Sequence, residues 1–135
     1  MAELSQGAAI PELRVTPDKY TPHRYAGASG DFNPIHIDND FAQGVGLPRN
    51  ILHGLYSMAQ VARAQSEAAG GNPLALRRLS IQFRGMGVPE EEIVVSGNVL
   101  EAGDGRAIVE TEAYQGDNGI IRNGVAELGL DSDLG

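Results

Sequence analysis

The order of secondary-structure signals limits the folds open to this chain. One long helical segment, from about residue 50 to residue 69, is followed only by segments with the character of strands. Apolar residues recur along the helical segment at steps of three and four, which places them on one face of an amphipathic helix. This face comprises Leu52, Leu55, Tyr56, Ala59 and Ala62, with Met58 and Val61 at its sides. A stripe this broad predicts a helix that is largely wrapped by other elements.

Four segments after Pro73 are rich in valine, isoleucine and alternating polar residues, which is typical of strands. They cover residues 76–84, 91–102, 106–115 and 119–130. Asp104-Gly105 and Asn118-Gly119 lie between the last three, and both dipeptides favour tight hairpin turns. With one more strand at residues 10–16, the pattern predicts an α+β protein: a curved antiparallel sheet of about five strands wrapped around one long central helix. This hot-dog fold buries both the helix stripe and one face of the sheet.

Length and composition restrict the class of protein. A chain of 135 residues predicts a single domain, here residues 1–135. The absence of cysteine excludes disulfides, thiolate nucleophiles and cysteine-ligated metals. A formal net charge of −8 argues against nucleic acid as the main partner. No apolar run approaches the ~20 residues that cross a bilayer, so we expect a cytoplasmic protein with no membrane partner.

The stretch SGDFNPIHID, residues 29–38, holds the strongest candidates for chemistry. Pro34 pushes the residue before it out of the helical region, and Gly30 loosens the chain upstream. We therefore expect a stiff, bent loop, neither helix nor strand, that holds Asp31 and His36 at a fixed separation. Asn33 restrains the turn through side-chain bonds to nearby backbone groups. The loop is either a proton-transfer site or a simple turn with a backbone-bonded histidine.

Two short helices are expected on either side of this loop. Asp18 or Thr21 can cap the first, which runs to about residue 28. Asp38 or Asn39 can start the second, which runs to about residue 45.

The run YAGASGDFNPIHIDNDFA, residues 25–42, followed by ILHGLYSMA, residues 51–59, resembles the signature of MaoC-like hydratases and dehydratases. The resemblance covers essentially the whole chain. It implies a hydro-lyase that reversibly hydrates trans-2-enoyl thioesters to (3R)-3-hydroxyacyl thioesters. The substrate would be carried on coenzyme A or acyl carrier protein, and no cofactor is implied.

In this chemistry Asp31 and His36 would activate one water on one face of the alkene, with Asn33 in support. Gly54 lies in the first turn of the central helix, where free N–H groups and the helix dipole suit a thioester oxygen that gains charge. The alternative for Gly54 is a glycine required by close packing. We expect His53 to pack against the site or to orient it.

A metal site is the main rival for these residues, because His36, Asp38, Asp40 and His53 could surround a divalent ion. The chain has no H-x-x-x-H pair on a helix, and Asp38 and Asp40 also suit the start of the second short helix. We therefore expect no metal.

Basic residues are unevenly distributed. Five of the ten lie between positions 49 and 84, where the only acid is Glu67. Arg77, Arg78 and Arg84 could meet the phosphates of coenzyme A or an acidic carrier protein. The alternative is a solvated face.

One position departs from some polyester-linked members of the family, which place a serine further along the central helix. The matching position here is Ala62, and neither Ser57 nor Ser66 replaces that serine by spacing. This leaves the acyl-chain preference open.

Two other roles remain possible: a hot-dog subunit that mainly pairs with a catalytic partner, and a thioesterase. The intact Asp31 and His36 weigh against the first, because non-catalytic subunits of related pairs lack them. In every case we expect a dimer, either a homodimer or a heterodimer with a related hot-dog subunit.

Overall fold

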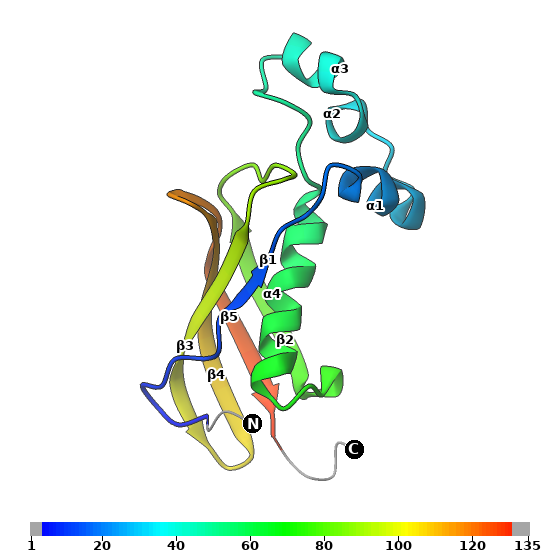
Figure 1. Cartoon of the computed structure of the whole chain (residues 1–135). Coiled ribbons are helices and arrows are strands. Elements are labelled where there is room, and N and C mark those ends of the chain that lie inside the picture. The colour runs from blue at the N-terminus through cyan, green and yellow to red at the C-terminus, as the bar shows by residue number, and fades with distance from the viewer. Residues whose placement is uncertain (1–3, 131–135) are drawn as a thin grey trace.

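The computed structural model describes residues 4–130, which form one five-stranded antiparallel sheet with a long helix on one face (Figure 1). The strand order is β1-β3-β4-β5-β2. The strands are β1 Leu13–Val15, β2 Leu76–Phe83, β3 Ile93–Gly103, β4 Arg106–Gln115 and β5 Asn118–Gly129. The helices are α1 Thr21–Ser29, α2 Pro34–Ile37, α3 Asn39–Gly44 and α4 Gly54–Ala68, with a 3-10 turn at Pro73–Ala75. The predicted α+β class and the five antiparallel strands are confirmed.

The two predicted hairpin turns have different outcomes. Asp104 and Gly105 have φ angles of 55° and 72°, so both adopt the positive φ that a tight turn between β3 and β4 requires. The turn between β4 and β5 is not at Asn118-Gly119, because β5 already starts at Asn118. Gly116, with φ 55°, and the residue after it form that turn instead. The Asn118 side chain donates to the carbonyl of Met86 at 2.9 Å, so it anchors the loop after β2.

The predicted buried face of the central helix is only partly correct. Val61 is buried and Tyr56 and Met58 pack against the core, but Leu55 is 62% exposed. The buried residues of α4 are Ser57, Val61, Ala64, Gln65 and Ala68. Alanines occur on several sides of this helix, so hydrophobicity alone did not select the side that faces the sheet. The buried side carries Val61, Ala64 and Ala68 together with Gln65, which donates to the Thr111 hydroxyl at 3.0 Å.

The boundaries at the start of the central helix also differ from the prediction. The helix begins at Gly54, and residues 50–53 lie outside it, with His53 in an extended conformation just before the first turn. This stretch passes beside α2, since the Ile51 N–H donates to the Ile35 carbonyl at 3.0 Å.

The three short helices α1, α2 and α3 lie together at one end of α4 (Figure 1). Residues 29–38 are not purely a loop, because Pro34–Ile37 forms one helical turn. Proline fits the first helical position, where its missing N–H is not needed, and the Asn33 side chain accepts from the Ile35 N–H at 3.2 Å. Asp38 caps α3 through the Phe41 N–H at 3.0 Å, as predicted.

The core lies between α4 and the inner face of the sheet. Its fully buried aliphatic residues include Val61, Ile93, Val95, Val109 and Leu128. Within the described residues, no helix combines the length and apolar character that a bilayer span needs.

Candidate active site

Asp31 is held in a tight turn directly after α1. Gly30 ends that helix with φ 79°, a left-handed conformation that favours glycine. The Asp31 side chain then accepts from the Asn33 N–H at 3.2 Å through Oδ1, which leaves Oδ2 free. The two successive side-chain bonds, Asp31 to Asn33 and Asn33 to Ile35, stiffen the turn as the sequence predicts for Asn33.

His36 lies on α2 and is 8% exposed. Its Nδ1 lies 2.9 Å from the carbonyl oxygen of Ile51. A carbonyl only accepts, so Nδ1 carries the proton of the neutral ring and Nε2 presents a lone pair. The Ile51 carbonyl, just before α4, therefore sets the tautomer in which His36 can accept a proton at Nε2.

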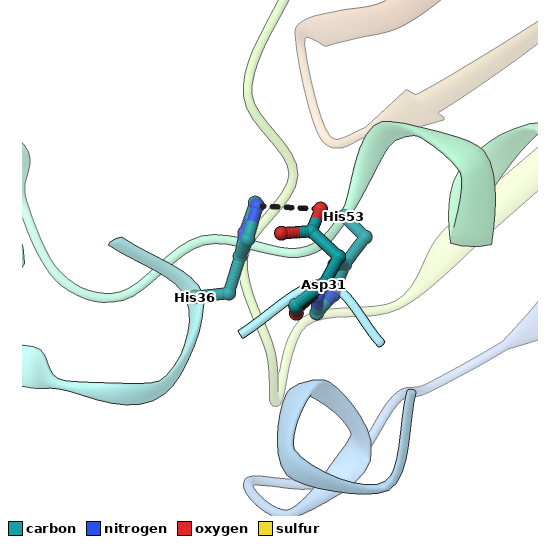
Figure 2. A group of neighbouring side chains, drawn as sticks. All are labelled: Asp31, His36 and His53. Atoms are coloured by element: carbon teal, nitrogen blue, oxygen red, sulfur yellow. Dashed lines mark hydrogen bonds and ion pairs between the residues drawn. The ribbon is translucent and has the colours of Figure 1, made fainter. Parts of the chain in front are cut away.

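The free atoms of Asp31 and His36 face each other. Figure 2 shows Nε2 of His36 directed at Oδ2 of Asp31, and the two atoms are 3.8 Å apart. This separation is too long for a direct hydrogen bond, and two acceptors do not bond each other. A water between them would satisfy both acceptors by donating one proton to each. The sequence prediction that residues 29–38 bring these two side chains together is confirmed, although His36 lies on the helical turn α2 rather than in a loop.

His53 completes this cluster from the start of α4. Its ring stacks on that of His36, with centroids 3.9 Å apart and planes 21° apart, and it is 2% exposed. Its Nε2 donates to the backbone carbonyl of Asp31 at 2.9 Å. Tyr25 covers its other side, with ring centroids 4.6 Å apart. His53 thus contacts both members of the pair, in the packing and orienting position that we expected.

Asp31, His36 and His53 are also the residues that could hold a metal, since one candidate ligand atom from each lies within 4.8 Å of the others. The lone pairs of a histidine lie in its ring plane. Because the two rings are nearly parallel, their lone pairs run side by side and do not converge on one point. This geometry suits a tetrahedral zinc site poorly. Asp38, a candidate ligand in the sequence, instead caps α3.

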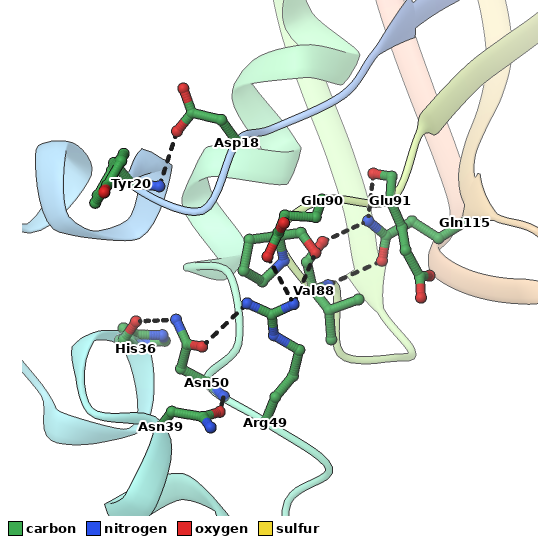
Figure 3. Close-up of polar contacts among 11 residues, drawn as sticks. Asp18, Tyr20, His36, Asn39, Arg49, Asn50, Val88, Glu90, Glu91 and Gln115 are labelled. Atoms are coloured by element: carbon green, nitrogen blue, oxygen red, sulfur yellow. Dashed lines mark hydrogen bonds and ion pairs between the residues drawn. The ribbon is translucent and has the colours of Figure 1, made fainter.

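A second network holds the segment before α4 in place (Figure 3). Asn50 is 5% exposed and donates to the backbone carbonyl of His36 at 2.9 Å. The Arg49 guanidinium lies 3.4 Å from the Asn50 side chain and forms an ion pair with Glu90 at 3.2 Å. Gln115 holds the loop that carries Glu90 through three bonds to its backbone. The sequence analysis missed Asn50 and Gln115, because single polar residues inside apolar segments carry no periodic signal.

His36 opens into a pocket of about 150 Å³ at the start of α4. The pocket is lined by His36, Ile51, Leu52, Gly54, Ser57, Phe83, Gly85, Met86, Gly87 and Ile120. A larger hollow of about 510 Å³, lined by Lys19, Tyr20, His23, Ile37, Asn39, Arg49, Asn50 and Glu90, contains none of the candidate catalytic residues. Of the two, only the smaller pocket is therefore bordered by candidate catalytic residues, His36 and Gly54.

Gly54 is the first residue of α4 and lines this pocket. A Cβ there would lie 3.1 Å from the ring of Phe83, so close packing also favours glycine. Both explanations predicted for Gly54 are therefore compatible with its surroundings.

The three arginines do not form one site. Arg77 and Arg78 lie near the start of β2, and Arg84 follows its end. At about 3.3 Å per residue, roughly 23 Å of strand separates Arg77 from Arg84. Only Arg84 is next to the pocket, between the lining residues Phe83 and Gly85.

With this geometry established, comparison with known proteins identifies the family. The family model described as "MaoC like domain" matches residues 6–119. The chain belongs to this MaoC-like family. It is 34% identical over 115 residues to the fatty acid synthase subunit beta of Saccharomyces cerevisiae, a match that covers 82% of this chain and 6% of that protein. It is 29% identical over 130 residues to the peroxisomal enoyl-CoA hydratase 2 of Arabidopsis thaliana, which covers 96% of this chain and 40% of that protein. This MaoC-like chain thus spans less than half of either relative.

Solved structures confirm the predicted hot-dog fold. The (R)-hydratase from A. caviae involved in PHA biosynthesis superposes with a TM-score of 0.85 at 22% identity, over 97% of this chain and 100% of that one. A chain of the ChsH1–ChsH2 complex from Mycobacterium tuberculosis superposes with a TM-score of 0.83 at 22% identity, over 96% of this chain and 100% of that one.

Proposed function

We propose that this MaoC-like chain reversibly hydrates trans-2-enoyl thioesters to (3R)-3-hydroxyacyl thioesters. The observation that carries the proposal is the arrangement of Asp31 and His36. Two acceptors converge on one water position, and His36 faces a pocket that also receives the start of α4. The name of the Arabidopsis relative, enoyl-CoA hydratase 2, supports the same reaction class.

The reaction balances with these residues alone. Asp31 and Nε2 of His36 accept hydrogen bonds from one water, whose oxygen bonds to C3 of the alkene. The electron pair of the double bond moves toward the thioester, and its carbonyl oxygen gains negative charge. The proton that the water loses to the pair is then delivered to C2 on the same face. The substrate gains one water molecule overall, and nothing is oxidised or reduced.

The start of α4 is placed to stabilise the charged intermediate. Free N–H groups in a first helical turn and the positive end of the helix dipole both favour a developing oxyanion. The Gly54 N–H lies in this turn and borders the same pocket as His36. We assign it to the thioester carbonyl oxygen.

The deciding experiment uses the purified chain and crotonyl-CoA. Hydration consumes the conjugated enoyl thioester, so its ultraviolet absorbance falls, and chiral chromatography of the hydrolysed product reports its hand. We expect the (3R) product. Cleavage to free coenzyme A without hydration would favour the thioesterase alternative. If the chain neither hydrates the thioester nor cleaves it, the role of a subunit that pairs with a catalytic partner is favoured.

A dimer forms part of the same proposal. The isolated chain leaves β2 at the edge of the sheet, and Phe83 and Met86 of the pocket are 52% and 51% exposed. A second hot-dog subunit placed against this edge would pair the open strand and close the pocket. The similarity to a chain of the ChsH1–ChsH2 complex supports pairing, with either an identical or a related subunit.

A further inference from the structure

The Ser57 hydroxyl is the one polar side-chain group of the pocket lining that the proposed chemistry does not use. Ser57 is 4% exposed and lines the pocket together with His36 and Gly54. Within residues 4–130, its hydroxyl makes no hydrogen bond of the kind seen for Ser29 and Ser66, and its oxygen is not one of the fully enclosed polar atoms. The oxygen therefore keeps access to the pocket, which places Ser57 to bond something that enters it.

Other helical serines in this chain behave differently. Ser29 donates to the carbonyl of Tyr25 at 2.8 Å, and Ser66 donates to the carbonyl of Ala62 at 3.2 Å. Both bonds reach four residues back, which is the usual way for a helix to satisfy a serine. Ser57 could make the same bond to the carbonyl of His53, but its hydroxyl does not. The side chain instead borders the pocket.

The helix end beside Ser57 is also open. Asn33 caps α2 and Asp38 caps α3, but His53 gives α4 no side-chain cap. Within the described chain, the N–H groups of Gly54 and Leu55 have no hydrogen-bond partner. Side chains on a helix lean toward its N-terminus, so the Ser57 side chain leans toward this uncapped first turn. Backbone and side-chain donors therefore meet at one end of the pocket.

We propose that the Ser57 hydroxyl is a second hydrogen-bond donor to the thioester carbonyl oxygen, next to the Gly54 N–H. This inference rests on the proposed hydratase function and adds a substrate-binding side chain to it. The oxygen gains charge as water adds to C3, so a preorganised donor stabilises the transition state more than the bound substrate. No proton leaves the serine, which acts only as a donor.

The first test compares Ser57→Ala with Ser66→Ala, which removes a hydroxyl from the same helix that is already bonded to its own backbone. Losing one oxyanion donor typically costs about 10²- to 10³-fold in turnover. We expect Ser57→Ala to lose about 100-fold in kcat for crotonyl-CoA and Ser66→Ala to stay near wild type. Ser57→Thr, which keeps the hydroxyl, should recover most of the loss. Circular dichroism and thermal unfolding establish that each variant folds.

The second test asks which atom the hydroxyl contacts, without relying on turnover. Butyryl-CoA is an unreactive saturated thioester, and S-butyl-CoA is the matching thioether without a carbonyl. Removing one neutral hydrogen bond weakens affinity by roughly 3- to 10-fold. Calorimetry should show that loss in Ser57→Ala for butyryl-CoA, and unchanged affinity for S-butyl-CoA.

Each other outcome is decisive. Equal loss for both ligands, no loss for either, or wild-type turnover in Ser57→Ala would overturn the proposal while the wild-type hydratase function stands. If the wild-type protein neither hydrates crotonyl-CoA nor binds butyryl-CoA, the proposed function itself is wrong, and the role of Ser57 falls with it.

Discussion

At the scale of single residues, the hydrogen bond between Nδ1 of His36 and the Ile51 carbonyl fixes where a proton can be taken up. It leaves Nε2 as the basic atom, opposite Oδ2 of Asp31. Asp31→Asn converts one acceptor into a group that also donates, and His36→Ala removes the other acceptor. Each change should lower kcat by at least about 10²-fold, the lower range for loss of general acid–base catalysis.

The same geometry also predicts the turnover of the double variant. Because both residues act on one water, the combined Asp31→Asn and His36→Ala protein should be little slower than the worse single variant. Steady-state kinetics with crotonyl-CoA, together with circular dichroism, check both points. Near-wild-type turnover in either single variant with an intact fold would refute the assignment.

At the scale of elements, the start of α1 depends on Asp18. Its carboxylate accepts from the Arg24 guanidinium at 2.9 Å and from the Tyr20 N–H at 2.8 Å. The bond from Arg24, followed by the one from the Tyr20 N–H, lowers the pKa of Asp18 below its ordinary value. A lowered pKa in the folded state means that this carboxylate stabilises the fold above its unfolded pKa, and that the contribution is lost as the pH falls through the folded pKa.

Asp18→Asn should therefore be less stable than wild type at neutral pH. The difference should shrink as the pH falls below about 3.9, the ordinary value of an aspartate. Urea unfolding at pH 7 and at pH 3 measures it, and Asp117→Asn in the β4–β5 turn serves as a control. A gap between wild type and Asp18→Asn that grows toward low pH would contradict this account.

β2 provides a test of the arginines, because its two ends differ in their distance from the pocket. Arg84 is next to the pocket-lining Phe83 and Gly85, whereas Arg77 lies at the other end of the strand. If Arg84 meets the phosphates of the carrier, Arg84→Gln should raise the KM for crotonyl-CoA and leave kcat nearly unchanged. The KM of the wild type should also rise with salt, since exposed charges are screened within about 8 Å at physiological ionic strength.

Arg77→Gln is the matched control, and its KM should stay closer to wild type. Equal effects of the two substitutions would indicate that the arginines attract the substrate through their overall charge rather than through a contact at the pocket. A KM that does not respond to salt or to either substitution would leave only the alternative in which these arginines form a solvated face.

The elements also show which parts of the structure the sequence can predict. Strands β2 to β5 were predicted within a few residues because β-branched runs and turn residues are local signals. Local signals also predicted the cap at Asp38 and the turn at Asn33. The buried face of α4 was only partly predictable in this way, because small residues lie on several of its sides. The contact of Gln65 with Thr111, which joins positions 46 residues apart, helps to fix the rotation of the helix.

The same limit applies to the site. A single motif in the sequence holds Asp31, Asn33 and His36, so their proximity was predictable. The stacking of His53 on His36 and the unpaired hydroxyl of Ser57 depend on how α4 meets the turn at Asp31. That contact joins segments about 20 residues apart, and spacing in the sequence does not encode it.

At the scale of the whole molecule, one side of the isolated chain has an open sheet edge and exposed apolar side chains. β2 is an edge strand with unpaired backbone groups, and Leu55 of α4 and Phe83 of β2 are 62% and 52% exposed on elements that border the pocket. Asp31 is also open, with 54% of its side chain exposed. Exposed edges and apolar side chains of this kind favour association with another subunit. We therefore expect the active unit to be at least a dimer, with the partner covering this side.

Leu55→Glu tests that expectation, because a carboxylate on an apolar interface is expensive to bury. The variant should dissociate at concentrations where the wild type is dimeric and should lose hydratase activity with the dimer. Leu100→Glu is the control, since Leu100 is 45% exposed on β3, which is separated from β2 by two strands, β4 and β5. Light scattering over a dilution series, with activity measured on the same samples, checks both.

A wild-type chain that is monomeric at nanomolar concentration and keeps its full specific activity would show that the pocket needs no partner. A chain that is monomeric and inactive alone would instead direct the search to a related hot-dog subunit.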